Sequence, residues 1–221
     1  MEKILDILDR LDDEVLAYGE LKNDLVFHKI PKDKVSYYIT ESLRLGEEKG
    51  KQYKTSNLIK LCNENEIKVE FVKKSGKFYS VQFRAEINFS KKENIIKIYE
   101  DSLMDLMNTY NKMVEEKDKL TYEEVINIHL AHEFYHYLEH RDKKYTNDIL
   151  EPICTFQLLS FKKEASVLKC SEIAAHKFCK EVLGLKYLPN IYDYVYLIET
   201  GEISLTNFND MITSWKKELI S

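Results

Sequence analysis

The segment from Tyr122 to Arg141 contains the residues of this chain that are best suited to catalysis. It reads YEEVINIHLAHEFYHYLEHR, in which His132, Glu133 and His136 form the pattern HExxH. Histidines four apart lie on one face of a helix, so both imidazoles can bind one metal ion. Glu133 projects to the side, where it can take a proton from a metal-bound water without being a ligand. The pattern predicts a catalytic Zn²⁺ site.

The residues around the motif predict a helix over Thr121–His140. Thr121 and Glu124 have the spacing of a capping box, which places the helix start just before the histidines. The nearby positions are uncharged, as expected of a helix buried around a metal site: Ala131, Phe134, Tyr135, Tyr137 and Leu138. His129 and His140 fall near the same face, and we expect them to be rim residues.

A catalytic zinc ion needs a third protein ligand and an open position for water. The metzincin pattern requires glycine at position 139 and histidine at position 142, and the chain has Glu139 and Asp142 instead. The other common solution takes a glutamate from a second helix downstream. The candidates are Glu139, Glu151, Glu164 and Glu172.

Glu172 is the favoured third ligand because it begins a strongly amphipathic helix. This segment, Ser171–Gly184, reads SEIAAHKFCKEVLG and opens on an N-cap residue. His176 lies one turn beyond Glu172, where it could hydrogen-bond the outer nitrogen of a ligand histidine. Glu164 has no such neighbour, but the 36 positions between His136 and Glu172 carry no clear motif, so Glu164 stays the alternative.

The composition of the 221 residues excludes other classes of function. The net charge is −5 and the pI is near 5.8, with eight acidic against three basic residues in Met1–Asp24. Direct nucleic-acid binding is therefore not expected, although the acidic start could dock a basic partner. Without an apolar run of membrane-spanning length or a secretory pattern, we expect a cytoplasmic protein with no membrane association. The four cysteines form no CxxC pair, which excludes a zinc ribbon.

Hydrophobic periodicity predicts a single, mainly helical α+β domain with a small, largely antiparallel sheet of three strands. Helices are expected before the sheet over Glu2–Val26, Lys32–Lys49 and Ser56–Glu64. The strands are expected over Ile67–Lys73, Phe78–Phe89 and Asn94–Tyr99. After the sheet, helices are expected over Ser102–Glu116, Thr121–His140, Ser171–Leu183 and Leu205–Leu219, with a less regular stretch before Lys169.

The segments HEFYHYLEH and SEIAAHKFCKEVL together resemble the ImmA/IrrE family of zinc metallopeptidases, which is itself similar to the gluzincins. The family pattern is HExxH followed by an ExxA(N/D)xFA helix, and His176 stands where the family usually has Asn or Asp. The runs NLIKLCNENEIKVEFV and RAEINFSKKENIIKIY also resemble the N-terminal part of the family. The resemblance implies a zincin-like core over 56–188, a helical extension over 1–50 and a helical addition over 189–221. It also implies His132, His136 and Glu172 as zinc ligands and Glu133 as the catalytic base.

The resemblance implies a zinc-dependent endopeptidase that cleaves a regulatory protein such as a transcriptional repressor. In gluzincin-like folds an exposed edge strand before the site helices binds the substrate as an added strand. We expect Asn94–Tyr99 to be this strand, with Ile96 and Ile98 contacting substrate. The alternative is a non-catalytic, zinc-containing interaction protein, such as an antirepressor or toxin-system component, that acts by binding a partner.

Overall fold

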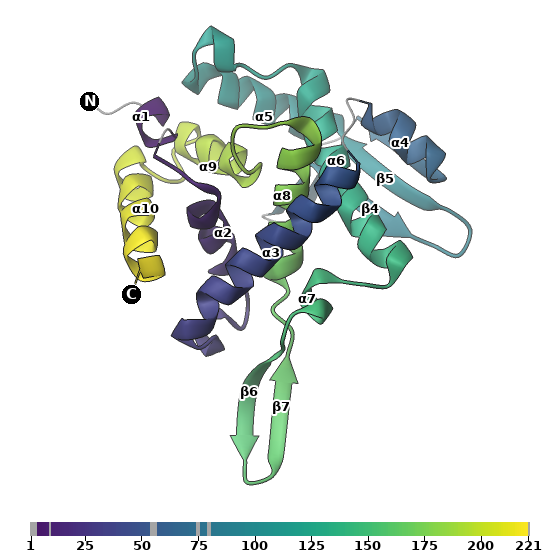
Figure 1. Cartoon of the computed structure of the whole chain (residues 1–221). Coiled ribbons are helices and arrows are strands. Elements are labelled where there is room, and N and C mark those ends of the chain that lie inside the picture. The colour runs from purple at the N-terminus through teal and green to yellow at the C-terminus, as the bar shows by residue number, and fades with distance from the viewer. Residues whose placement is uncertain (1–3, 9, 54–56, 74–75, 79–80, 221) are drawn as a thin grey trace.

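A computed structural model describes residues 4–8, 10–53, 57–73, 76–78 and 81–220 (Figure 1). The helices are α1 (Ile4–Leu8), α2 (Asp13–Leu21), α3 (Lys32–Gln52), α4 (Leu58–Glu64), α5 (Glu100–Met113), α6 (Tyr122–Asp142), α7 (Thr146–Ile149), α8 (Lys169–Leu183), α9 (Asn190–Glu199) and α10 (Leu205–Ile220). The strands are β1 (Ile67–Val72), β2 (Gly76–Phe78), β3 (Val81–Phe83), β4 (Ala85–Phe89), β5 (Asn94–Tyr99), β6 (Ile153–Leu158) and β7 (Phe161–Ala165). The mainly helical α+β class expected from the sequence is confirmed.

The three-stranded sheet is mixed and has the order β1–β5–β4. Strand β5 pairs in parallel with β1 and antiparallel with β4, so it is the central strand. The prediction that Asn94–Tyr99 is an exposed edge strand with Ile96 and Ile98 contacting substrate is therefore wrong. Both isoleucines are 0% exposed and pack in the core. The edge strand nearest the site is β4, which packs against α6.

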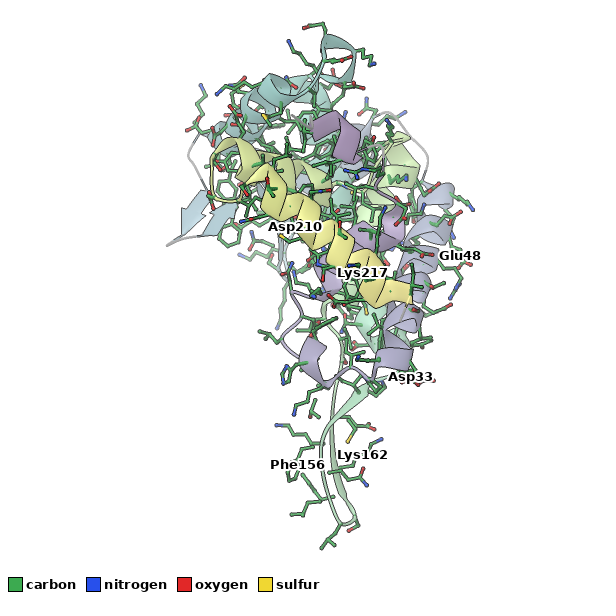
Figure 2. All side chains as sticks on the ribbon, turned by 90° about the vertical axis from the view of Figure 1, so that its left-hand side faces the viewer. Asp33, Glu48, Phe156, Lys162, Asp210 and Lys217 are labelled. Atoms are coloured by element: carbon green, nitrogen blue, oxygen red, sulfur yellow. The ribbon has the colours of Figure 1, made fainter. Side chains whose placement is uncertain are left out.

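Two hairpins stand outside this sheet. The expected strand Phe78–Phe89 is divided, because β3 pairs with β2 and β4 starts a separate pairing with β5; Tyr79 and Ser80 of this segment lie outside the described residues. In the stretch expected to be irregular, β6 and β7 form an antiparallel hairpin that projects away from the helices (Figures 1 and 2). Phe156 and Lys162 on this hairpin are both exposed.

Helix α8 packs lengthwise against α3, and two glycines of α3 make the close approach possible. A Cβ atom on Gly46 would lie 2.3 Å from the carbonyl oxygen of Ala174. A Cβ on Gly50 would lie 2.6 Å from Cβ of Glu181. Small residues on both helices thus fix the position of α8, which carries Glu172.

The expected single helix over Glu2–Val26 is two helices, α1 and α2, of which Asp12 caps the second by accepting from the backbone N–H of Val15 at 2.8 Å. The residues 1–3 and 9 lie outside the described part of the chain. Part of the acidic charge at this end is used internally, because Asp13 pairs with Lys177 and Lys180 of α8 at 3.0 and 2.7 Å. This pairing holds α2 against the helix that carries Glu172.

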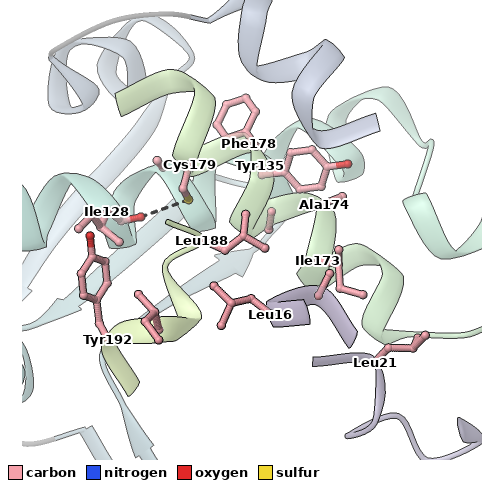
Figure 3. Packing of buried hydrophobic residues seen from close by; sticks show 14 of the residues in the cluster. Leu16, Leu21, Ile128, Tyr135, Ile173, Ala174, Phe178, Cys179, Leu188 and Tyr192 are labelled. Atoms are coloured by element: carbon pink, nitrogen blue, oxygen red, sulfur yellow. Dashed lines mark hydrogen bonds between the residues drawn. The ribbon is translucent and has the colours of Figure 1, made fainter. Parts of the chain in front are cut away.

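One hydrophobic core joins the helices of both ends to the helices of the middle. Leu16 of α2, Ile128 and Tyr135 of α6, and Phe178 of α8 belong to the same cluster (Figure 3). Trp215 of α10 also belongs to it. Within the described residues, no helix combines the length and the apolar character needed to cross a membrane.

Candidate metal centre

The helix that carries HExxH begins where its sequence predicts. The Thr121 hydroxyl accepts from the backbone N–H of Glu124 at 3.2 Å, and the Glu124 carboxylate accepts from the backbone N–H of Thr121 at 2.7 Å. This capping box satisfies two backbone donors that the first turn leaves free. Helix α6 then continues to Asp142, where Lys143 ends it in the left-handed conformation, with φ of 50°.

His132, His136 and Glu172 converge from α6 and α8 on one point. The two imidazole Nε2 atoms are 3.2 Å apart. The Glu172 carboxylate lies 3.2 Å from Nε2 of His132 and 3.7 Å from Nε2 of His136. One ligand atom from each of the three residues lies within 4.8 Å of the other two, so this group could hold a metal ion.

The other three candidate glutamates have different partners. Glu164 lies on the exposed strand β7 and pairs with Lys162. Glu151 pairs with Lys34 at 2.8 Å. Glu139 lies behind the cluster and contacts His136 on the ring nitrogen that faces away from Glu172. Among the four candidates, the described structure brings only Glu172 to the two Nε2 atoms.

Glu139 is a buried carboxylate, 4% exposed, that orients His136. Its Oε2 accepts from His136 Nδ1 at 3.0 Å and from the Ser171 hydroxyl at 2.5 Å, and its Oε1 accepts from the backbone N–H of Thr146 at 2.8 Å. Burial alone would raise the pKa of Glu139, but these hydrogen bonds outweigh burial and the pKa is lowered. The carboxylate is therefore charged, the proton of His136 is on Nδ1, and Nε2 offers its lone pair to a metal.

The expected hydrogen bond from His176 to the outer nitrogen of a ligand histidine is not present among the described residues. The His176 ring lies beside that of His132, with centroids 5.0 Å apart, but its Nδ1 is buried and has no hydrogen-bond partner among the described residues. The hydrogen bond to the outer nitrogen of a ligand histidine comes instead from Glu139, to His136. The Cys179 thiol of α8 donates to the backbone carbonyl of Ile128 at 3.5 Å.

Glu133 lies between the cluster and the sheet. Burial raises its pKa, while the neighbouring His132 and His136 and the nearby backbone of Ile87 in β4 act in the opposite direction. Its pKa is raised overall, which moves this carboxyl toward the range where it can both accept and release a proton near neutral pH. Because α6 packs against β4, Glu133 lies close to this edge strand.

A cleft of about 310 Å³ opens onto the cluster. His132, Glu133, Glu172 and His176 line one part of it, and His129 lines another. The Nδ1 atom of His129 donates to the carbonyl of Val125 at 2.8 Å, and burial lowers the pKa of His129 to about 4, so this ring is neutral at pH 7. Two of the three residues that could hold a metal ion, His132 and Glu172, thus line a space that can admit a ligand.

Of the residues expected near the rim, His140 lies elsewhere. Its ring stacks on Phe89 with centroids 3.9 Å apart, and its Nδ1 lies 2.9 Å from the hydroxyl of Tyr145. The tyrosine that lines the cleft is Tyr192, from α9. No pattern in the sequence marks Tyr192, because α9 begins 48 positions after the end of the HExxH helix and carries no motif.

Comparisons of the chain with models of protein families, with curated proteins and with solved structures find no match.

Proposed function

We propose that the chain is a zinc-dependent peptidase. The observation that carries the proposal is the convergence of two imidazole nitrogens and one carboxylate, beside a further carboxylate that is not part of the group. Two histidines and a glutamate with an adjacent general base are the donor set of one class of hydrolytic zinc enzymes. The resemblance to the ImmA/IrrE family points to the same class.

The spacing of the donor atoms fits zinc. Ligand atoms about 2.0–2.2 Å from a tetrahedral Zn²⁺ lie about 3.3–3.5 Å from one another. Here the two Nε2 atoms are 3.2 Å apart, Oε2 of Glu172 lies 3.2 Å from Nε2 of His132, and Oε1 of Glu172 lies 3.7 Å from Nε2 of His136. Nitrogen and carboxylate donors also suit other divalent ions, but Zn²⁺ is the ion that three such ligands most often hold in hydrolases.

Zn²⁺ held by His132, His136 and Glu172 would supply Lewis acidity to a substrate carbonyl and to an attacking water. Glu133 would take the proton of that water and return it to the leaving amine, a task that suits a carboxyl with a raised pKa. Glu139 would keep His136 in the tautomer that leaves Nε2 free.

We propose that the substrate is an extended peptide that pairs with the free edge of β4. An edge strand leaves backbone N–H and C=O groups without sheet partners, and an extended peptide can satisfy them. Strand β4 is at the edge of the sheet, and Ile87 within it contacts Glu133. A peptide on this edge would therefore pass the proposed base. By resemblance, the physiological substrate would be a regulatory protein such as a repressor.

The test compares the native chain with Glu133→Gln and with the control Glu123→Gln, an exposed residue of the same helix. Each form is loaded with zinc, and its metal content and its cleavage of a mixed peptide library are measured. We expect equal zinc in all three and cleavage by the native and Glu123→Gln forms only. Stoichiometric zinc without cleavage by the native chain would favour the non-catalytic interaction protein. Full activity of Glu133→Gln would refute the proposed base.

A further inference from the structure

Arg84 lines the same cleft as the metal-ligating group. It lies between β3 and β4, and its side chain is only 12% exposed. Among the described residues that line the cleft, it is the only arginine or lysine. The acidic residues that line the same cleft are Glu20, Glu133, Glu172 and Asp193.

The known partners of Arg84 use only part of its guanidinium. Its Nε and Nη2 both donate to one oxygen, Oδ1 of Asp193, at 3.0 and 2.5 Å. The guanidinium carbon lies 5.0 Å from the ring centroid of Tyr196. The third nitrogen, Nη1, is buried and has no partner in the part of the chain that the structure describes. A buried donor without an acceptor is unfavourable, so this nitrogen is available to an acceptor that enters with a ligand.

The position of Arg84 along the chain relates it to the catalytic residue. Arg84 precedes the first residue of β4, and Ile87, which contacts Glu133, is three residues further on. At about 3.3 Å per residue, three residues of a strand span about 10 Å. A peptide paired with β4 would therefore place a side chain near Arg84 about three residues from the bond that faces Glu133.

The charges around Arg84 favour a carboxylate as the ligand. Guanidinium binds carboxylates through charge-assisted hydrogen bonds, and one arginine can bridge two of them. Asp193 already takes one side of the fork. His129, whose pKa is affected by the Arg84 charge, is neutral at pH 7 and does not compete as a cation.

We propose that Arg84 forms a carboxylate-binding subsite, which selects peptides with an acidic side chain or a chain-end carboxylate about two to four residues from the scissile bond. The inference rests on the proposed peptidase function for the position of that bond. It adds to that function a substrate class, acidic peptides, that the metal-ligating group alone does not define.

The experiment measures binding instead of turnover, so that it separates the subsite from the peptidase activity. The probes are peptide hydroxamates, in which the hydroxamate binds the metal and a peptide tail extends from it. One set of tails corresponds to the N-terminal side of the scissile bond and another to the C-terminal side. Each tail carries Glu or Gln at the second, third or fourth residue from the hydroxamate. The tails of this series end in amides, whereas a parallel series of Gln tails ends in a free carboxylate. Dissociation constants are measured by calorimetry on the zinc-loaded native, Arg84→Met and Arg44→Met chains. Arg44 is an exposed residue of α3, outside the residues that line the cleft, so its substitution controls for the lost charge.

For the native chain and Arg44→Met, we expect the best Glu probe to bind about tenfold more tightly than its Gln counterpart. In Arg84→Met this ratio of affinities should fall to about one. The affinity for a probe whose tail consists of leucine residues should not change. A Gln tail with a free carboxylate could bind the native chain as tightly as the Glu tail does. If this tight binding is lost in Arg84→Met, the chain end is the source of the carboxylate. A Glu-to-Gln ratio near one at every position would overturn the subsite and leave the metal centre standing.

Failure of all hydroxamates to bind the native chain would overturn the metal centre itself, and with it this inference. If Arg84→Met does not fold, Asp193→Asn provides the second test. It keeps Arg84 and removes its carboxylate partner, so the preference for Glu over Gln should increase. An unchanged or smaller preference in Asp193→Asn would contradict the proposal.

Discussion

Replacing Glu139 by Gln tests how the protein prepares His136 for a metal. The substitution keeps the shape of the side chain but replaces one carboxylate oxygen by an NH₂ group. Glu139 accepts three hydrogen bonds, two on Oε2 and one on Oε1. An amide has a single acceptor oxygen, so it cannot replace both carboxylate oxygens.

The two orientations of the amide have different consequences. If its oxygen faces Thr146, its NH₂ faces His136 Nδ1, which must then accept, and the proton moves to Nε2, where it blocks metal binding. If its oxygen faces His136 and Ser171, its NH₂ opposes the backbone N–H of Thr146. A buried donor without an acceptor costs about 1–3 kcal/mol of unfolding free energy. Loss of such an orienting hydrogen bond typically weakens metal affinity about 10- to 100-fold.

The assay is competition for zinc against a fluorescent chelator at pH 7, for the native chain, Glu139→Gln and the control Glu123→Gln. Urea unfolding of the metal-free proteins measures stability separately. We expect a zinc dissociation constant about 10- to 100-fold higher in Glu139→Gln and unchanged in Glu123→Gln. If the zinc affinity of Glu139→Gln stays within about twofold of native while its stability falls, Glu139 has only a structural role and the reasoning is refuted.

Two further predictions concern the frame of the site. Gly46→Ala should lower the unfolding free energy by about 1–3 kcal/mol in urea titrations, because its Cβ would lie 2.3 Å from the Ala174 carbonyl, and a gain in stability would contradict this packing. Asp142, hydrogen-bonded to Arg141 and Lys49, has its pKa lowered from 3.8 to about 2. The pKa of Asp142 is lower in the folded protein than in the unfolded chain. Its ion pairs therefore contribute fully to the unfolding free energy above about pH 4, and this contribution is lost as the pH falls toward 2. Asp142→Asn should therefore cost about 1–2 kcal/mol at pH 7 and progressively less below pH 4, and a cost that is independent of pH would contradict the ion-pair explanation.

The parts of the site that sequence could predict depend on local patterns. The capping box and the HExxH spacing lie within one helix, so the positions of His132, Glu133 and His136 follow from helix geometry. Glu172 was favoured because of its amphipathic helix, and the structure shows that this helix packs through Ala174 against Gly46 of α3. The role of Glu139 was missed because it was considered as a ligand, although its position three residues after His136 places the two side chains together.

The parts that sequence could not predict depend on contacts between distant segments. The alternation in Asn94–Tyr99 indicates a strand, but its place in the sheet is set by pairing with β1, which starts 27 positions earlier. The β6–β7 hairpin has no glycine or asparagine at its turn, where Leu159 adopts a φ of 53°. The pairing of Arg84 with Asp193 joins residues 109 positions apart, and no motif marks either of them.

The zinc content of the Glu172→Gln chain tests the central claim most directly. The measurement is metal per chain after equilibrium dialysis against a fixed low concentration of free zinc, with Glu164→Gln as the matched control from β7. We predict one zinc ion per chain in the native protein and in Glu164→Gln, and much less than one in Glu172→Gln. Equal zinc in all three, or loss of zinc in Glu164→Gln alone, would contradict the assignment of His132, His136 and Glu172 as the metal ligands.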